Sequence, residues 1–269
     1  MRAWVLGSGS RGNAVLVETR GIRLLVDAGY GTRTLAQRLQ ATGVAPESID
    51  ACIVTHDHSD HARGAAAAVR KWFWPLFATP GTAASEYLAD TPLKTFAPGA
   101  TLQFDDVEVR TFATPHDATE PVGLTVTDTR TGARAGICYD VGRTSDAVRA
   151  LCADVDVLVL ESNYEEGMLW AGPYPPWLCQ RIAGGSGHLS NKAAAELARE
   201  SVTKRLAHVV LAHLSEQNNT PATAYETSKR ALARTRFSGT LSMAPQDVVS
   251  GPFLPFGQTM EAQRQLSLF

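Results

Sequence analysis

The sequence predicts an α/β fold in which two β-sheets stack face to face and helices cover their outer faces, an αββα four-layer sandwich. Short apolar strands alternate with helical segments through both halves of the chain. Each sheet needs its apolar faces covered, and two strand-rich halves that both carry helices meet this need by stacking. The 269 residues, 44% of them hydrophobic, are enough for one large domain with a full core.

Each half supplies its own strands and helices. In the first half, strands are expected near residues 3–6, 14–19, 22–27 and 51–54, and helices near residues 32–42 and 61–72. In the second half, strands are expected near residues 107–114, 122–128, 134–139, 156–160 and 208–212, and helices near residues 144–152, 191–204 and 221–234. The stretch from Trp170 to Gly187 is rich in proline and glycine and is predicted to be a long functional loop.

We expect one domain over residues 1–251 and a tail over residues 252–269, because no linker or low-complexity segment precedes Pro252. No apolar run approaches the roughly 18 residues of a membrane span. The chain begins directly with a predicted strand, without a signal-peptide pattern. The cysteines are scattered through apolar contexts, which is typical of reduced core residues in a cytoplasmic protein. They are Cys52, Cys138, Cys152 and Cys179.

The segment His56-Asp57-His58-Ser59-Asp60-His61 follows the apolar run Ala51 to Val54 and is the most informative part of the chain. Its closely spaced imidazoles and carboxylate are typical metal ligands. On an extended loop His56 and His58 point the same way, whereas Asp60 and His61 lie one step further on and can face a second ion. A solvated polar loop is the alternative. The helical HExxH arrangement does not apply, because no glutamate follows His56.

Three of the other histidines lie at the ends of predicted elements, where functional sites usually assemble. His116 comes just after a strand, His188 lies in a glycine-rich loop before a helix, and His213 ends the strand Val209 to Ala212. His208 begins that same strand, so we interpret it as structural. Asp140 ends a further apolar strand, where a carboxylate can bridge two ions.

This ordered set of motifs, together with Val26-Asp27-Ala28-Gly29, resembles the metallo-β-lactamase superfamily over nearly the whole chain. The resemblance implies two divalent ions, zinc or manganese, since histidine-rich sites favour zinc and mixed histidine and carboxylate sites also accept manganese. The implied ligands are His56, His58 and His116 for one ion, Asp60, His61 and His213 for the other, and Asp140 between them. Asp27 is implied to fix the ligand loop by hydrogen bonds; the alternative is a turn residue before Gly29.

Within the superfamily the chain is most similar to the YycJ/WalJ group of bacterial nucleases, and more distantly to ribonuclease Z. The similar motifs are residues 6–13, Gly172-Pro173-Tyr174-Pro175, Gly187-His188-Leu189-Ser190-Asn191 and residues 211–215. One departure is Ser162-Asn163-Tyr164-Glu165, where the group often has a histidine, which puts a substrate contact from that loop in doubt. Larger nucleic-acid enzymes of the superfamily carry an inserted clamp domain. The interval between Asp140 and His188 is too short to contain one, so no inserted clamp domain is expected.

The resemblance to this group implies an exonuclease that degrades DNA from 5′ ends. Asp60 and Asp140 would offset only part of the charge of two divalent ions, and the remaining positive charge suits a phosphodiester anion. Asp60 is the candidate for holding the proton of the attacking water, and His188 is the candidate general acid or phosphate donor. The alternative for His188 is a residue of a helix-capping loop.

The formal charge of −2 gives the chain no general affinity for nucleic acid. Local phosphate contacts are predicted instead from the glycine-rich loop of residues 7–12 and from the motif around His188. The candidates are Ser10, Arg11, Asn13, Ser190 and Asn191. A plain hairpin turn is the alternative for the glycine-rich loop.

The last residues, Gln265-Leu266-Ser267-Leu268-Phe269, resemble the short peptide by which bacterial replication and repair proteins dock on the DNA polymerase sliding clamp. Leu268 and Phe269 would enter an apolar pocket, while Gln265 and Leu266 would fix the register. Tethering to the clamp would raise the effective DNA concentration. It would also favour DNA over RNA and link the enzyme to repair or replication. The alternative is that this apolar tail folds back onto the protein's own surface.

Two other functions stay open from the sequence. The first is a metallohydrolase of a small substrate, such as a thioester or a cyclic phosphate. The second is a clamp-bound accessory protein with a structural metal site. The large ligand set argues against the second, because a structural site is normally closed by about four ligands around one ion.

Overall fold

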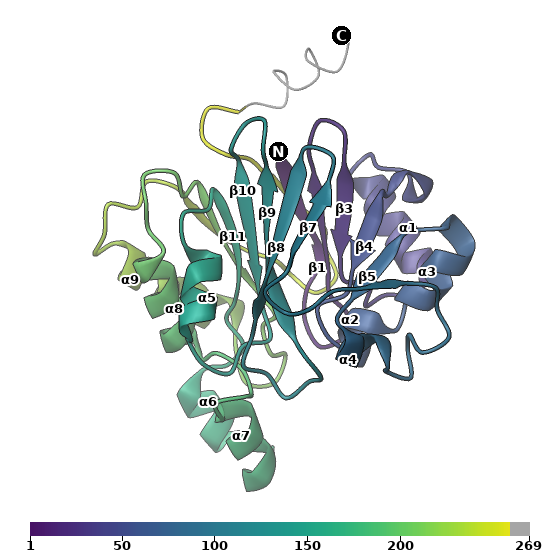
Figure 1. Cartoon of the computed structure of the whole chain (residues 1–269). Helices are drawn as coiled ribbons and strands as arrows, with labels where there is room; N and C mark the ends of the chain where they lie inside the picture. Colours follow the sequence, from purple (N-terminus) through teal and green to yellow (C-terminus); the bar gives the residue numbers. More distant parts are fainter. Residues whose placement is uncertain (259–269) are drawn as a thin grey trace.

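The computed structural model describes residues 1–258, which form two seven-stranded sheets packed face to face with helices outside them (Figure 1). The first sheet has the order β14 (Ser250–Phe253), β1 (Arg2–Gly7), β2 (Ala14–Glu18), β3 (Arg23–Val26), β4 (Ala51–Ile53), β5 (Leu76–Ala78) and β6 (Lys94–Thr95). The second has the order β13 (Thr240–Met243), β12 (His208–Ala212), β11 (Val157–Glu161), β10 (Arg134–Cys138), β9 (Val122–Asp128), β8 (Val107–Ala113) and β7 (Thr101–Phe104).

The helices divide between the two sheets. The first sheet is accompanied by α1 (Thr32–Ala41), a short 3₁₀ turn (Pro46–Ser48), α2 (Ser59–Ala62), α3 (Ala65–Trp72) and α4 (Pro80–Ala83). The second is accompanied by α5 (Asp146–Cys152), α8 (Asn191–Glu200) and α9 (Pro221–Leu232). Two more helices, α6 (Glu166–Ala171) and α7 (Pro176–Ala183), project beyond the body of the molecule (Figure 1). We call residues 166–183 the arm.

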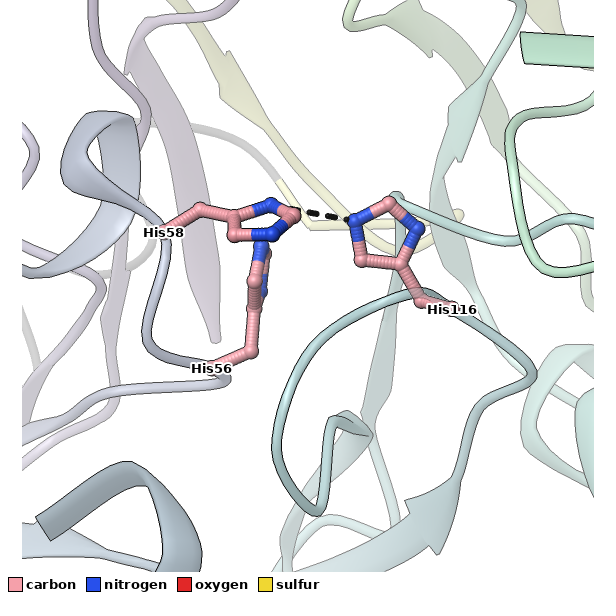
Figure 2. A group of neighbouring side chains, drawn as sticks. All are labelled: His56, His58 and His116. Atoms are coloured by element: carbon pink, nitrogen blue, oxygen red, sulfur yellow. Dashed lines mark hydrogen bonds between the residues drawn. The ribbon is translucent and has the colours of Figure 1, made fainter. Parts of the chain in front are cut away.

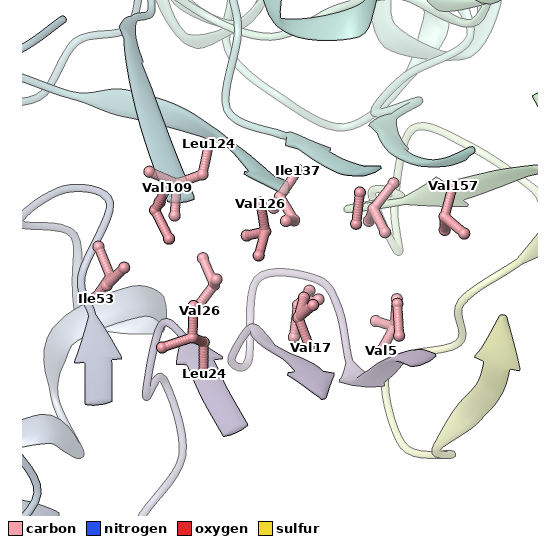
Figure 3. Close-up of a cluster of buried hydrophobic side chains, with 14 of the residues drawn as sticks. Val5, Val17, Leu24, Val26, Ile53, Val109, Leu124, Val126, Ile137 and Val157 are labelled. Atoms are coloured by element: carbon pink, nitrogen blue, oxygen red, sulfur yellow. The ribbon is translucent and has the colours of Figure 1, made fainter. Parts of the chain in front are cut away.

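Buried side chains fill the three spaces between these four layers. Val5 and Val26 of the first sheet face Val109 and Ile137 of the second in the central core (Figure 3). Neighbouring residues on the same strands, such as Leu6, point the opposite way and pack under the helices. Because central strands such as β2 and β11 are covered on both faces, they are buried throughout and almost entirely apolar, whereas the edge strands β6 and β7 are partly exposed. The predicted αββα sandwich is confirmed.

Strand direction brings the site residues to one edge of this sandwich. Strands β3 and β4 are parallel to each other, and so are β10, β11 and β12. The loops that follow parallel neighbours leave the same edge of a sheet. Residues that follow β3, β4, β10 and β12 in the sequence, such as Asp27 and Asp140, therefore meet across the two sheets.

Two predicted segments differ from the structure. The helix expected near residues 61–72 is divided into α2 and α3 at Gly64, where a side chain would clash with the carbonyl oxygens of Ala28 and Tyr30. The stretch from Trp170 to Gly187, predicted to be a loop, instead contains the end of α6 and the whole of α7.

The end of the described chain belongs to the first sheet. Strand β14 pairs with β1 in antiparallel fashion and carries the fold to Phe253, so the predicted boundary after residue 251 falls inside a strand. The predicted clamp-binding peptide lies outside the described residues. Among the helices of residues 1–258, none is both long and apolar enough to cross a membrane.

Candidate metal centre

Three histidines meet where the loops after β4 and β8 approach each other (Figure 2). His56, His58 and His116 each offer a ring nitrogen, and the three nitrogens lie within 4.8 Å of one another. Nδ1 of His58 is 3.2 Å from Nε2 of His116. The structure thus brings together the three residues expected to hold the first ion.

A second group adjoins the first. Single ligand atoms of Asp60, His61 and His213 lie within 4.8 Å of one another, and so do those of His56, His61 and Asp140. Oδ2 of Asp140 is 2.8 Å from Nε2 of His61, and its Oδ1 is 3.8 Å from Nε2 of His116. Asp140 therefore lies between the two groups, in the place expected of a shared ligand.

Unpaired polar atoms support a metal ion at this place. Nε2 of His56 is buried and has no hydrogen-bond partner among the described residues, and the buried Oδ2 of Asp140, although 2.8 Å from Nε2 of His61, forms no hydrogen bond of regular geometry. Leaving a buried polar atom unpaired costs about 1–3 kcal/mol. A divalent cation would satisfy both atoms, and a set of histidine nitrogens and carboxylate oxygens suits zinc or manganese.

The charges of these side chains suit a bound cation, because metal binding needs ionised carboxylates and displaces protons from the imidazoles that become ligands. Burial, together with the charge of His61, lowers the pKa of His56 well below its usual value. Burial would raise the pKa of Asp60, but His61 and a hydrogen bond with His213 outweigh it and hold that pKa well below its usual range. Burial opposes a charge on His213, yet Asp140 and other carboxylates raise its pKa to about 10. The centre therefore attracts positive charge.

Asp27 lies behind the ligands and holds two of the site's loops. Its Oδ1 accepts a hydrogen bond from the backbone N–H of Thr55 at 2.7 Å. Its Oδ2 is 2.7 Å from Nδ1 of His61 and accepts from the Tyr139 hydroxyl at 2.6 Å and from the Thr55 hydroxyl at 2.9 Å. The carboxylate thereby orients the ring of His61 with Nε2 toward Asp140.

Replacing Asp27 by asparagine is expected to weaken metal binding roughly 10- to 100-fold. Whichever way the amide is turned, one of its N–H groups faces a donor that the carboxylate now accepts. Asparagine keeps the size of the side chain and tolerates the positive φ of 63° at this position. Competition with a fluorescent chelator measures the affinity, and an unchanged affinity would show that Asp27 does not orient the ligand loop.

Three site residues adopt a left-handed backbone at the ends of strands. The φ angles are 63° at Asp27, 55° at Asp140 and 53° at His213, after β3, β10 and β12. This conformation costs roughly 1–2 kcal/mol in a residue with a side chain. Surrounding contacts hold these strained turns. The turns direct Asp140 and His213 into the metal centre and Asp27 toward the ring of His61 behind it.

Glu161 is a site residue that the sequence analysis missed. It is fully buried at the end of β11, where its Oε2 accepts from the backbone N–H groups of Val141 at 3.0 Å and Leu189 at 3.1 Å. Its Oε1 is 2.8 Å from Nδ1 of His188 and 3.1 Å from Nδ1 of His213. Burial would raise the pKa of Glu161, but the charge of His188 and its hydrogen bonds bring that pKa to about 2.

The sequence did contain one indication of this role. Glu161 ends an apolar strand as Asp140 follows one, and the two strands are parallel neighbours. Asn163, in the stretch that departs from the YycJ/WalJ pattern, was also missed as a structural contact. Its Nδ2 donates to the carbonyl oxygen of His213 at 2.9 Å, so this residue supports the turn of a predicted ligand.

His188 faces a cavity of about 240 Å³ beside the centre. The cavity is lined by Asp60, Asp140, His188 and His213 of the centre and by Tyr174, Leu178 and Arg181 of the arm, among others. The His188 side chain is 21% exposed, and its Nδ1 is 3.4 Å from Oδ1 of Asp140. Burial opposes a charge on this ring, but Glu161 and Asp140 raise its pKa above the usual value.

The predicted phosphate contacts of the first loop are placed differently from one another. Ser10 is exposed and lines the cavity. Arg11 is paired with Glu216 at 2.8 Å and Asp247 at 2.6 Å, so its charge is already compensated. Asn13 is fully buried and donates from Nδ2 to Oδ2 of Asp60 at 3.0 Å. A phosphate contact is therefore retained for Ser10 alone in this loop.

The motif after His188 serves helix α8. Ser190 caps its first turn by accepting from the N–H of Ala193, and Asn191 exchanges buried hydrogen bonds with Ser162 and Asn219. Both residues are buried, and neither belongs to the cavity lining. The expectation that they contact phosphate is corrected to a structural role.

Comparison with known proteins agrees with this geometry. A family model described as a beta-lactamase superfamily domain matches residues 22–213. Exodeoxyribonuclease WalJ of Streptococcus pneumoniae is 33% identical over 238 residues, which cover 86% of this chain and 87% of that protein. Exodeoxyribonuclease YycJ of Bacillus anthracis is 32% identical over 220 residues, covering 80% of this chain and 83% of that protein.

A solved structure shows the same fold. The metallo-β-lactamase fold protein YhfI from Bacillus subtilis matches with a TM-score of 0.68 and 18% identity, covering 93% of this chain and 99% of that one. The family and fold predicted from the sequence are thereby confirmed. The chain is a metal-dependent hydrolase that belongs to the metallo-β-lactamase superfamily and, within it, to the family of WalJ and YycJ.

Proposed function

We propose that this protein is a two-metal exonuclease that hydrolyses DNA from 5′ ends and acts in DNA repair or replication. The observation that carries the proposal is the pair of adjoining ligand groups that meet at Asp140, with His188 beside them on the same cavity. Two relatives that are 32–33% identical to this chain are named exodeoxyribonucleases, which supports DNA as the substrate.

The two groups define the metal sites of the proposal. His56, His58 and His116 would hold one ion, Asp60, His61 and His213 the other, and Asp140 would contact both. When bound, two divalent ions such as zinc or manganese would lower the pKa of a bound water and stabilise the attacking and leaving oxygens during displacement at the phosphorus of a phosphodiester.

Asp60 and His188 are suited to opposite proton tasks. Asp60 is ionised and partly exposed at the cavity, where Asn13 fixes its Oδ2 at 3.0 Å, so it can accept a hydrogen bond from the attacking water. His188 keeps its proton because the two neighbouring carboxylates raise its pKa. It can therefore donate that proton to the leaving oxygen.

The size of the cavity is compatible with a polymeric substrate that enters only by its end. Pockets that enclose a small molecule usually measure about 300–1,000 Å³, whereas this cavity measures about 240 Å³. One phosphodiester and part of one nucleotide would fill it, and the rest of the substrate would lie outside. An enzyme that acts at the end of a strand needs a cavity that takes in the terminal nucleotide and leaves the rest of the strand outside.

The test is cleavage of 5′- and 3′-labelled single-stranded and duplex DNA, with RNA beside them, in zinc or manganese. Mononucleotides or short products released from 5′ ends of DNA support the proposal. Release from 3′ ends would correct its direction, and preferential cleavage of RNA would correct its substrate. If no polymer were cleaved while small phosphodiesters or thioesters were, the protein would be a small-substrate hydrolase.

Deleting Gln265 to Phe269 is expected to abolish binding to the DNA polymerase sliding clamp. Cleavage of short free oligonucleotides should not change, because the predicted metal ligands all lie at or before His213. Surface plasmon resonance with immobilised clamp measures the binding, and a Leu268→Ala, Phe269→Ala variant tests the two anchors alone. Clamp affinity that survived the deletion would refute the role of this peptide.

A further inference from the structure

The arm carries two tryptophans on its surface. Trp170 is 57% exposed on α6 and Trp177 is 65% exposed on α7. The other three tryptophans, Trp4, Trp72 and Trp74, are buried. Large exposed aromatic side chains that gather on one projecting element mark an interaction site more often than a stable free surface.

The exposure of these two side chains does not come from loose packing of the arm. Leu169 of α6 and Cys179 of α7 are buried together with Tyr164 in a small apolar cluster. The Cys179 thiol also donates to the carbonyl oxygen of Leu169 at 3.3 Å. These contacts fix the side of the arm that packs against itself and Tyr164, while both indoles are exposed to solvent.

The same arm forms a wall of the metal cavity. Leu178, Arg181 and Ile182 of α7 line it. Arg181 is paired with Asp117, the residue after the predicted ligand His116. This pair ties the arm directly to the metal centre.

Helix periodicity places Trp177 beside this wall. Residues four apart lie on one face of a helix, so Trp177 shares a face with Arg181, and it directly precedes Leu178, which also lines the cavity. A chain that leaves the cavity along α7 would meet the indole within about one nucleotide or two.

Charge decides which kind of contact the arm can offer. The formal charge of −2 gives the chain no general affinity for nucleic acid. Helix α7 contains no acidic residue and one arginine, already paired. Stacking on an aromatic side chain adds affinity for single-stranded nucleic acid without adding charge, and it accepts any base because every base has a flat face.

We propose that Trp177, assisted by Trp170, is a stacking platform for unpaired bases of the strand whose end enters the metal cavity. The inference rests on the proposed nuclease function and narrows its substrate to single-stranded or frayed DNA ends. A base within a duplex is already stacked on both faces and cannot use the platform. The cavity of about 240 Å³ has room for one phosphodiester, so only one strand can enter it.

The test compares the metal-loaded wild type with Trp177→Ala, Trp177→Phe and Phe73→Ala. Binding of a cleavage-resistant phosphorothioate thymidine oligonucleotide is followed by fluorescence anisotropy. Trp177→Ala is expected to raise its Kd roughly 5- to 100-fold, and Trp177→Phe to restore most of the affinity. Phe73, 84% exposed at the end of α3 beside the other sheet, is the matched control and should have no effect.

Two further measurements separate the platform from the metal site. Oligonucleotide binding should quench tryptophan fluorescence in the wild type and quench it less in Trp177→Ala. Metal content, measured by mass spectrometry after gel filtration, should be the same in both proteins.

The outcomes distinguish this inference from the function on which it rests. If the wild type degrades DNA and Trp177→Ala binds and degrades single strands equally well, the platform is refuted and the nuclease stands. If the wild type cleaves no nucleic acid, the proposed nuclease function is refuted, and the platform that rests on it is refuted with it. If Trp177→Ala only removes a concentration-dependent dimer, seen by analytical ultracentrifugation, the arm binds a second copy of the chain and the platform is refuted.

Discussion

Replacing Asp140 by alanine is expected to remove bound metal and hydrolytic activity together, with a loss of rate of roughly 1,000-fold or more. Oδ2 of Asp140 is 2.8 Å from His61, and its Oδ1 is 3.4 Å from His213 and 3.8 Å from His116. One substitution therefore takes a ligand from both groups. It also leaves crowded imidazoles without the negative charge that attracts a cation to them.

Asparagine at position 140 is the more informative variant. Asp140 has a φ of 55°, which alanine adopts at a cost of roughly 1–2 kcal/mol but asparagine tolerates well. Alanine thus combines a metal defect with a backbone defect, whereas asparagine removes only the charge. In the presence of a chelator, Asp140→Asn should melt near the wild-type temperature. Added zinc or manganese should raise the melting temperature of the wild type much more than that of the variant.

Asp57 supplies a control within the same motif. Its carboxylate accepts from the backbone N–H and the hydroxyl of Thr119, at 3.0 and 2.8 Å, and it belongs to none of the ligand groups in the described chain. Asp57→Asn should therefore keep its metal, measured by mass spectrometry after gel filtration. Full metal content and a wild-type rate in Asp140→Asn would refute the assignment of Asp140 as a shared ligand.

The clustering of the predicted ligands could be anticipated because their chemistry is visible in short motifs. The histidine spacing in the segment from His56 to His61 is typical of metal binding, and His116 and His213 follow apolar strands. Glu161 could not be assigned in this way. Its role depends on His188 and His213, which reach it from a distant loop and from the neighbouring strand. A buried contact of this kind has no local pattern.

The arm was missed for a different reason. Prolines at positions 173, 175 and 176 argued for a loop, but Pro175 and Pro176 occupy the cap and the first position of α7. Proline suits the first position because its nitrogen would have no helical partner there. At Asn13 a functional contact was expected where the structure shows a structural one. Its position next to a glycine-rich loop suggested a phosphate contact, yet the residue is buried and its amide donates to Asp60.

Replacing His188 by alanine is expected to leave the metal in place and slow DNA cleavage by roughly 100- to 10,000-fold. The residue faces the cavity and belongs to neither predicted ligand set, although its ring nitrogen also lies within 4.8 Å of ligand atoms of Asp140, Glu161 and His213. The defect should depend on the leaving group. An alkoxide of DNA needs a proton as it departs, whereas p-nitrophenolate is stable without one. Hydrolysis of bis(p-nitrophenyl) phosphate should therefore remain close to the wild-type rate.

Glu161→Gln tests whether the proton that His188 is proposed to donate depends on the buried carboxylate of Glu161. Oε1 of Glu161 faces Nδ1 of both His188 and His213, while Oε2 accepts two backbone N–H groups, so no orientation of the amide preserves every contact. The variant should show the same dependence on leaving group as His188→Ala, with a smaller loss. If His188→Ala instead slowed both substrates equally, His188 would act by supporting Asp140 and His213, and its role as general acid would be wrong.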